Sequence, residues 1–166
     1  MNHTLIAALE SVLAKANTYY HGSRADFDEF TKLGTGKHGK GFYFTPDFKE
    51  ARLYANTLAG DGTRNDPRVF TVKLKFKKPY NTMSVPDASE VAEYFGLVYR
   101  PPRFAGGAKE HYHALEKQLK KAGKVKKDGL NEAIVQAGFD ALEYEFMKHI
   151  VVFDPKQIKV TKVEKV

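Results

Sequence analysis

The segment from Arg68 to Lys78 carries the pattern that most restricts what this chain can fold into. Its sequence, RVFTVKLKFKK, has an apolar side chain at every second position from Phe70 to Phe76, and threonine or lysine stands between them. Successive side chains of a β-strand point to opposite faces, so this alternation predicts a strand with one covered face and one solvated face.

Helices and further strands are predicted on both sides of that segment. Apolar residues recur at helical spacing over residues 3–16. Thr45-Pro46-Asp47 has the composition of a helix start, with Thr45 as the cap. That helix is expected to end near Gly60 and to turn five side chains inward: Phe48, Ala51, Tyr54, Ala55 and Leu58.

The remaining elements follow from periodicity and from turn residues. Helices are predicted over residues 87–95, 109–122 and 129–137, and short strands over 18–21 and 41–44. The C-terminal part is predicted to form two strands around a short turn and then a last strand. The segment from Gly34 to Gly41 holds four glycines, and we interpret it as a mobile loop.

Composition narrows the class of protein. The chain has 166 residues, 42% of them hydrophobic and 28% charged, which indicates a single globular domain over residues 1–166. No apolar run approaches the roughly 18 residues needed to cross a bilayer, and we see no secretory signal. Cysteine is absent from the sequence, which excludes disulfides and Cys-ligated zinc. Together these features fit a cytoplasmic protein that does not interact with membranes.

The net charge of +7 is partly concentrated between Lys109 and Asp128, where seven lysines stand against three acidic residues. Basic surfaces attract nucleic acid or acidic proteins. A solvated helix face is the alternative, and the sequence shows no RRM, KH or zinc-finger pattern that would favour nucleic acid.

Two motifs suggest a ligand pocket. In His21-Gly22-Ser23, a histidine at a strand end can donate to a ribose hydroxyl, and the glycine lets the backbone approach a ligand amide. Tyr43 and Tyr54 follow on a strand and on a helix, and two such rings can sandwich a flat heterocycle. A histidine in a turn and two core aromatics are the alternative interpretation of each motif taken alone.

The order of these motifs resembles a known family. YHGS followed by GKGFYFTPDFKEARLYA resembles the diphtheria-toxin and PARP-like ADP-ribosyltransferases, which carry a His-Tyr-Glu signature. The closing GFDALEYEFMKHIVVFDPKQIKV resembles the small versions found in phage and mobile-element polyvalent proteins. The resemblance covers residues 18–60 and 136–160, whereas residues 80–130 do not align. It implies an α+β fold with a split, mostly antiparallel sheet and flanking helices.

The resemblance also implies an activity and a role for individual residues. The enzyme would transfer ADP-ribose from NAD to a macromolecule and release nicotinamide. His21 would hold the nicotinamide ribose, Gly22 would pair with the carboxamide and Ser23 would lie beside the ribose. The other implied roles are ring stacking by Tyr43 and Tyr54 and diphosphate contacts by Lys37, His38 and Lys40.

The sequence departs from the family at the catalytic glutamate, because His149 stands at the matching position before VVF. Cleavage of the nicotinamide–ribose bond passes through an oxocarbenium-like transition state, which a carboxylate stabilises and a histidine does not. Glu143 and Glu145 are expected on one face of their strand, where one of them would replace the missing acid. The alternative is that both are solvent-facing strand residues. If the turn falls at Met147-Lys148, Glu145 would lie close to His149 across the strand pair.

Three functions stay open at this point. The first is ADP-ribosyl transfer to an acceptor: a host protein, or else a nucleic acid or nucleoprotein. The second is a binding or inhibitor protein that has lost catalysis at His149 and grips a partner with its basic surface. The third is NAD hydrolysis. No metal is expected, since HExxH is absent and a helix would point His111 and His113 apart.

Overall fold

The structure of the chain is a computed structural model in which contacts between residues define two compact units. Unit 1 comprises Met1–Glu29, Phe44–Lys75 and Lys156–Val166, and unit 2 comprises Phe30–Tyr43 and Phe76–Pro155. The helix expected over residues 3–16 lies outside the described part. The structure describes residues 18–24, 27, 29–31, 33–36, 38–57, 66–102, 109–126, 129–144 and 149–166.

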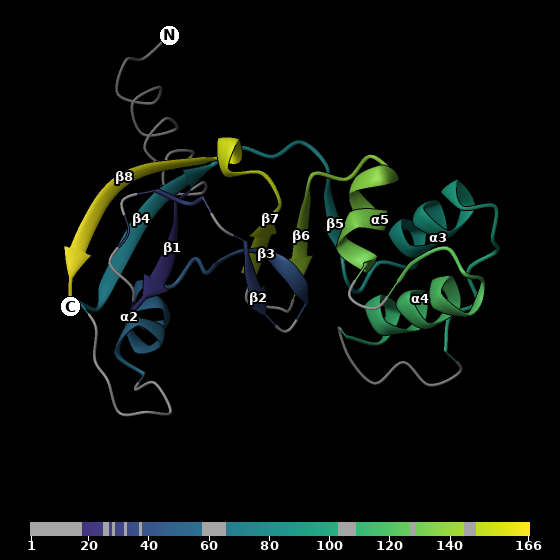
Figure 1. Cartoon of the computed structure of the whole chain (residues 1–166), viewed down its shortest axis with the longest axis horizontal. Coiled ribbons are helices and arrows are strands. Elements are labelled where there is room, and N and C mark those ends of the chain that lie inside the picture. The colour runs from purple at the N-terminus through teal and green to yellow at the C-terminus, as the bar shows by residue number, and fades with distance from the viewer. Residues whose placement is uncertain are drawn as a thin grey trace, which may run out of the picture. The chain divides into compact units, whose positions relative to one another are not determined.

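The described residues of unit 1 form a three-stranded sheet and one helix (Figure 1). Strand β4 (Arg68–Leu74) is central and pairs antiparallel with β1 (Thr18–Ser23) and with β8 (Ile158–Lys165). Helix α2 (Phe48–Asn56) packs on this sheet through Ala51 and Ala55, which contact Val69. The expected strand over 18–21 therefore exists and continues through the His-Gly-Ser motif to its last residue.

The alternating segment forms strand β4, which ends at Leu74 and is therefore four residues shorter than predicted. Phe70, Val72 and Leu74 are buried, whereas Thr71 and Lys73 between them are half-exposed. The start of the strand departs from strict alternation of buried and exposed residues. Val69 is also fully buried, because α2 covers the sheet face that this residue occupies.

Helix α2 begins two residues later than the sequence suggested. Its cap is Asp47, whose carboxylate accepts a hydrogen bond from the backbone N–H of Lys49 at 2.8 Å. Thr45 instead forms an isolated bridge with Tyr20, and its hydroxyl donates to Glu50. The expectation that Thr45 caps the helix was wrong because the β-bridge holds Thr45 beside β1.

In unit 2, the residues that the structure describes form a five-stranded sheet and three helices that pack on it. The sheet is antiparallel in its β2–β3 and β6–β7 pairs and parallel in the β5–β6 pair. The helices are α3 (Val85–Tyr94), α4 (Lys109–Lys121) and α5 (Leu130–Gln136). The strand order is β2 (Gly34–Gly36), β3 (Gly39–Phe44), β7 (His149–Val152), β6 (Ala141–Tyr144) and β5 (Pro79–Asn81).

The core of unit 2 forms where the three helices meet the sheet. Leu115 and Leu119 of α4 and Ile134 of α5 are fully buried with Leu142 of β6 and Val151 of β7. The C-terminal prediction is confirmed: β6 and β7 form an antiparallel pair, and β8 follows after the 3₁₀ turn Pro155–Gln157.

Both units combine helices with mostly antiparallel strands, and the strands form two separate sheets. The expected α+β class with a split sheet is therefore confirmed, whereas the single domain over residues 1–166 stays a prediction. Among the described helices, none is both long and apolar enough to cross a membrane.

Candidate active site

In unit 1, β1 presents His21 on one sheet face and Gly22 on the other. The His21 ring lies 5.7 Å from that of Phe44 and 6.2 Å from that of Phe70, between ring centroids. Phe70 is also the residue paired with His21 across the ladder. Aromatic side chains therefore fix the orientation of the imidazole, and Ser23 is the last residue of the strand.

The backbone of Gly22 faces the outer edge of the sheet. Tyr20 and Thr45 exchange two backbone hydrogen bonds, of 2.8 and 3.0 Å, on the side of β1 away from β4. In an antiparallel ladder, residues two apart direct their N–H and C=O to the same side. Gly22 therefore directs both groups to that edge, where the described part of the chain supplies no backbone partner.

Gly22 is also where α2 approaches the sheet most closely. A Cβ atom built on Gly22 would lie 1.9 Å from the carbonyl oxygen of Ala51. The glycine thus has a packing role that the sequence did not reveal. Because Gly22 and His21 alternate along β1, α2 covers the face opposite to the His21 ring.

Tyr54 projects from α2 into solvent. Its exposed fraction is 61%, and the neighbouring Leu53 is 71% exposed. The expectation that Tyr54 turns inward was wrong because α2 packs through its small residues Ala51 and Ala55. The phenol ring is consequently accessible to a ligand, while its predicted stacking role stays untested.

Tyr43 belongs to unit 2 and is fixed by the turn between β2 and β3. Its hydroxyl donates to the carbonyl of Gly39 at 2.6 Å and accepts from the N–H of His38 at 3.1 Å. Burial raises the pKa of this phenol above its usual value. The ring also lies against Gly36, where an added Cβ would be 2.5 Å away.

The segment from Gly34 to Gly41 is a β-hairpin and not the mobile loop we expected. Its two strands pair antiparallel, with Gly34 opposite Gly41. Lys40 is exposed on β3, and Lys37 lies outside the described residues. His38 is fully buried, so the expectation that it contacts a diphosphate does not fit this structure.

Glu143 and His149 lie on opposite faces of the β6–β7 pair. The ladder places Glu143 across from Ile150 and Tyr144 across from His149, and directly paired residues share a face. Glu143 is half-exposed, whereas His149 is 5% exposed. The register differs from the one we assumed for a turn at Met147-Lys148, and Glu145 lies outside the described residues.

Tyr144 is the centre of an aromatic cluster in unit 2. Its ring centroid lies 5.1 Å from that of His149, 4.3 Å from that of His38 and 6.3 Å from that of Tyr43. Two predicted site residues, Tyr43 and His149, therefore both lie against the ring of Tyr144. Tyr144 could not be identified from the sequence, because its contacts depend on the register between β6 and β7.

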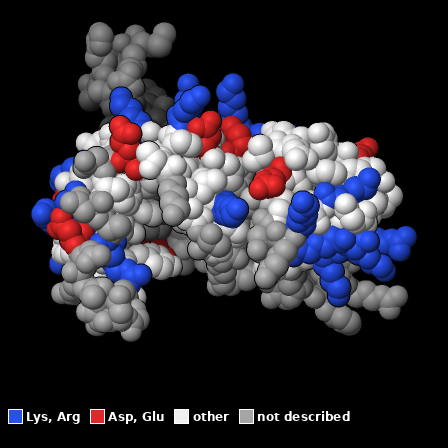
Figure 2. Space-filling model, viewed as in Figure 1, with Lys and Arg blue, Asp and Glu red and all other residues white. Residues whose placement is uncertain are grey.

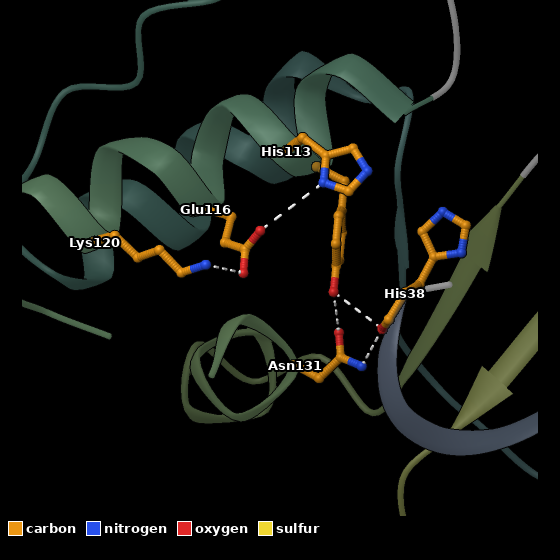
Figure 3. A network of polar contacts seen from close by, with 6 residues as sticks. His38, His113, Glu116, Lys120 and Asn131 are labelled. Carbon is orange, nitrogen blue, oxygen red and sulfur yellow. Dashed lines mark hydrogen bonds and ion pairs between the residues drawn. The ribbon is translucent and has the colours of Figure 1, made fainter. Parts of the chain in front are cut away.

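Tyr112 of α4 and Asn131 of α5 are two further residues that sequence reasoning missed. Figure 3 shows Asn131 beside the carbonyl of His38. The Tyr112 hydroxyl lies 3.0 Å from the carbonyl oxygen of His38 and 2.8 Å from Oδ1 of Asn131. The Asn131 amide donates to the carbonyls of His38 and Lys40, at 2.5 and 3.0 Å. Both side chains are buried, and both fasten the hairpin that carries Lys40 and Tyr43.

The basic segment is helix α4 and the residues that follow it. Lys and Arg side chains gather there on the face shown in Figure 2. Lys120 pairs with Glu116 at 2.6 Å. Within the described residues, Lys117, Lys121 and Lys124 are exposed and have no ion-pair partner, so this face carries net positive charge.

Metal ligation has no support in the described part of the chain, which holds no group of three or more His, Cys, Asp or Glu side chains placed to bind an ion. His111 is turned into the protein, where its Nδ1 meets the hydroxyl of Tyr99 at 2.9 Å. His113 is about half-exposed.

The two split sheets, with the His-Gly-Ser strand at the edge of one, are those expected of an ADP-ribosyltransferase fold. A family model described as ADP-ribosyltransferase in polyvalent proteins matches residues 15–165. Since this match covers nearly the whole chain, the protein belongs to that family. No curated protein and no solved structure matched the chain.

Proposed function

We propose that this protein binds NAD and transfers its ADP-ribose to a macromolecular acceptor, with nicotinamide as the leaving group. Membership of the ADP-ribosyltransferase family supports the reaction class. The observation that carries the proposal is the outward-facing backbone of Gly22 next to the fixed ring of His21.

Gly22 offers the complement of the nicotinamide carboxamide. A primary amide has N–H donors and a carbonyl acceptor, and the Gly22 backbone has one acceptor and one donor directed to the same edge. Paired hydrogen bonds of this kind would orient the nicotinamide ring. His21 would donate to a hydroxyl of the attached ribose, and Ser23 would lie beside that ribose.

Stacking and charge would supply the rest of NAD binding. The exposed ring of Tyr54 and the ring of Tyr43 would stack on the nicotinamide. Lys40, which is exposed on β3, and Lys37 would meet the diphosphate.

The reaction breaks the bond between ribose C1′ and the nicotinamide nitrogen. The electron pair leaves with nicotinamide, so positive charge develops on the ribose, as it does in glycoside cleavage. The acceptor's nucleophilic atom then forms a bond to C1′ and loses its proton. A carboxylate that holds a ribose hydroxyl at about 3 Å would stabilise the developing charge.

Glu143 and Glu145 are the proposed sources of that carboxylate. Glu143 is half-exposed on β6, and Glu145 is the next acidic residue in the sequence. His149 is buried against Tyr144, so we propose that it supports the site by packing or by holding a hydroxyl.

The acceptor is proposed to be an acidic host protein, as expected for an effector-like phage enzyme acting inside its host's cytoplasm. The exposed lysines of α4 carry uncompensated positive charge within the described residues. Such a face raises the rate of encounter with an acidic partner. Nucleic acid and nucleoprotein acceptors are also negatively charged. Nuclease treatment in the experiment below distinguishes a nucleic-acid acceptor from a protein acceptor.

A second candidate function is a binding protein without catalysis. The buried histidine at the position of the family glutamate and the lysine face of α4 favour it. Hydrolysis of NAD by water is the third outcome that the same experiment identifies.

The test is incubation of the purified protein with NAD labelled in its adenosine part, together with a bacterial lysate. Free nicotinamide and labelled macromolecules are both measured, with and without nuclease, for Glu143→Gln, Glu145→Gln and His149→Gln. Glu132→Gln is the matched control, because Glu132 is exposed on α5. Transfer predicts equal amounts of nicotinamide and bound label, both lost in one of the two Glu143 and Glu145 variants.

Two results would contradict the proposal. Nicotinamide release without bound label would identify hydrolysis. Absence of both products, together with binding of a lysate protein that a charge reversal on α4 abolishes, would identify the binding protein.

A further inference from the structure

The β2–β3 hairpin has little stability of its own. β2 is three residues long, and two of the three are glycines. Within the described part of the chain it is an edge strand, because the sheet order pairs it with β3 alone. A short glycine-rich hairpin is marginal in water by itself, so its shape must depend on contacts from the rest of unit 2.

Contacts converge on the hairpin turn from β3 itself and from two helices of unit 2. Tyr43 of β3 binds the turn through Gly39 and His38. From α4, Tyr112 approaches the carbonyl of His38. From α5, Asn131 donates to the carbonyls on both sides of Gly39. Figure 3 shows Asn131 and the His38 carbonyl within this network.

Gly39 makes the close approach of Asn131 possible. Its φ of 82° lies in the left-handed region that favours glycine, and an added Cβ would lie 3.0 Å from the amide nitrogen of Asn131. The turn is thus shaped to receive this amide. The His38 ring, fully buried beside Tyr112 and Tyr144, is anchored in the same place.

We propose that Tyr112 and Asn131 are positioning residues for NAD. They hold the hairpin so that Tyr43 and Lys40 are presented in one fixed arrangement. A ligand that meets a preorganised site avoids the entropic cost of ordering it. This inference rests on the proposed function, since it takes the hairpin to be part of the NAD site, and it adds two residues that do not touch NAD themselves.

The position of Tyr112 also connects the hairpin to the helix that carries the lysine face. Tyr112 lies one turn of α4 before Glu116, which binds Lys120 at 2.6 Å. The test therefore has to separate hairpin positioning from acceptor docking, and it does so by measuring NAD cleavage without a macromolecular acceptor, where water takes the acceptor's place and bonds to ribose C1′.

The experiment compares Tyr112→Phe and Asn131→Asp with the wild type. The first variant keeps the ring and removes the hydroxyl. The second keeps a side-chain oxygen that accepts from Tyr112. It removes the amide group that donates to the carbonyls of His38 and Lys40, and it puts a carboxylate oxygen in its place. Tyr80→Phe is the matched control, because the Tyr80 hydroxyl is buried in the same core and has no partner among the described residues.

We expect the KM for NAD in nicotinamide release to rise roughly fivefold in Tyr112→Phe, the scale of one lost hydrogen bond, while kcat changes little. Asn131→Asp should raise KM more than about tenfold. Amide hydrogen exchange over residues 38–44 should accelerate in both variants. Tyr80→Phe should match the wild type in KM and in exchange.

Two outcomes overturn the inference. An active wild type whose Tyr112→Phe and Asn131→Asp variants lose thermal stability but keep the KM for NAD would reduce both residues to a structural role. A folded wild type that neither binds nor cleaves NAD would overturn the proposed function, and the inference with it.

Discussion

Gly22 of β1 lies directly beneath Ala51 of α2, so close that a Cβ on Gly22 would stand 1.9 Å from the Ala51 carbonyl oxygen. Strand backbone and helix backbone are therefore in contact at this point. The same residue directs its N–H and C=O to the outer edge of the sheet. Gly22 thus allows close packing of α2 on β1, and its backbone N–H and C=O groups face the sheet edge.

The first prediction concerns this contact. Gly22→Ala should destabilise the protein by about 1–3 kcal/mol or more, because the methyl group must push α2 away from β1. The free energy of unfolding in urea measures it. Gly34→Ala is the control, since its added Cβ would have only an ordinary contact of 3.6 Å. Equal unfolding midpoints for Gly22→Ala and the wild type would contradict the packing we describe.

Tyr54 gives a second prediction, because a side chain that is 61% exposed contributes little to folding. Tyr54→Ala should lower NAD affinity about 5- to 100-fold, the range expected for loss of aromatic stacking on a base. Its melting temperature should stay close to that of the wild type. Calorimetric titration with NAD provides the affinity.

Leu53→Ala is the matched control for Tyr54, since it is a neighbour on α2 with an exposed fraction of 71%. It should bind NAD like the wild type. If Tyr54→Ala also binds NAD like the wild type, Tyr54 has no role in stacking.

The lysine face of α4 gives a third prediction. In the double variant Lys117→Glu/Lys121→Glu, labelling of the acceptor should fall while nicotinamide release without acceptor is unchanged, because these lysines are proposed to guide the acceptor and not NAD. The loss should be largest at low ionic strength, where charges are least screened.

A charge-matched control separates this effect from net charge alone. Lys75→Glu/Lys159→Glu makes the same change on exposed lysines of unit 1. If both double variants lose acceptor labelling equally, α4 is not a specific docking surface.

Buried tyrosines give a fourth prediction, about pH. Burial raises the pKa of Tyr43, Tyr80 and Tyr99 above the ordinary value of 10.0. The unfolded chain therefore releases these protons at a lower pH than the folded protein. The resulting stability is fully present below pH 10 and is lost as the pH rises above it.

Urea unfolding measured between about pH 8 and pH 11 tests this sign. As the pH rises above 10.0, the ordinary pKa of tyrosine, the free energy of unfolding should fall more steeply for the wild type than for Tyr80→Phe. A slope that Tyr80→Phe leaves unchanged would show that this phenol titrates normally in the folded protein.

The sequence predicted elements whose pattern is local. The alternation from Phe70 to Phe76 identified β4, and the apolar run after His149 identified β7. It failed where a distant partner decides the structure. Gly34 to Gly41 has the composition of a loop, but Tyr112 and Asn131, more than 70 residues away, hold it as a hairpin.

Two predictions about residues near the candidate site were wrong for the same reason. Thr45 has the chemistry of a helix cap, but the bridge to Tyr20 places it beside β1. Tyr54 has helical spacing with the inward residues, but α2 contacts the sheet through Ala51 and Ala55. A register between two strands, such as Tyr144 with His149, also cannot be inferred from either strand alone.

Transfer of ADP-ribose is best distinguished from the other two functions by following both halves of NAD at once. The purified protein is incubated with lysate and with NAD that carries one label in nicotinamide and another in adenosine. We expect free nicotinamide and macromolecule-bound adenosine label to appear in equal amounts, and we expect His21→Ala to abolish both. NAD that stays intact in the presence of folded wild-type protein would contradict the proposed transfer.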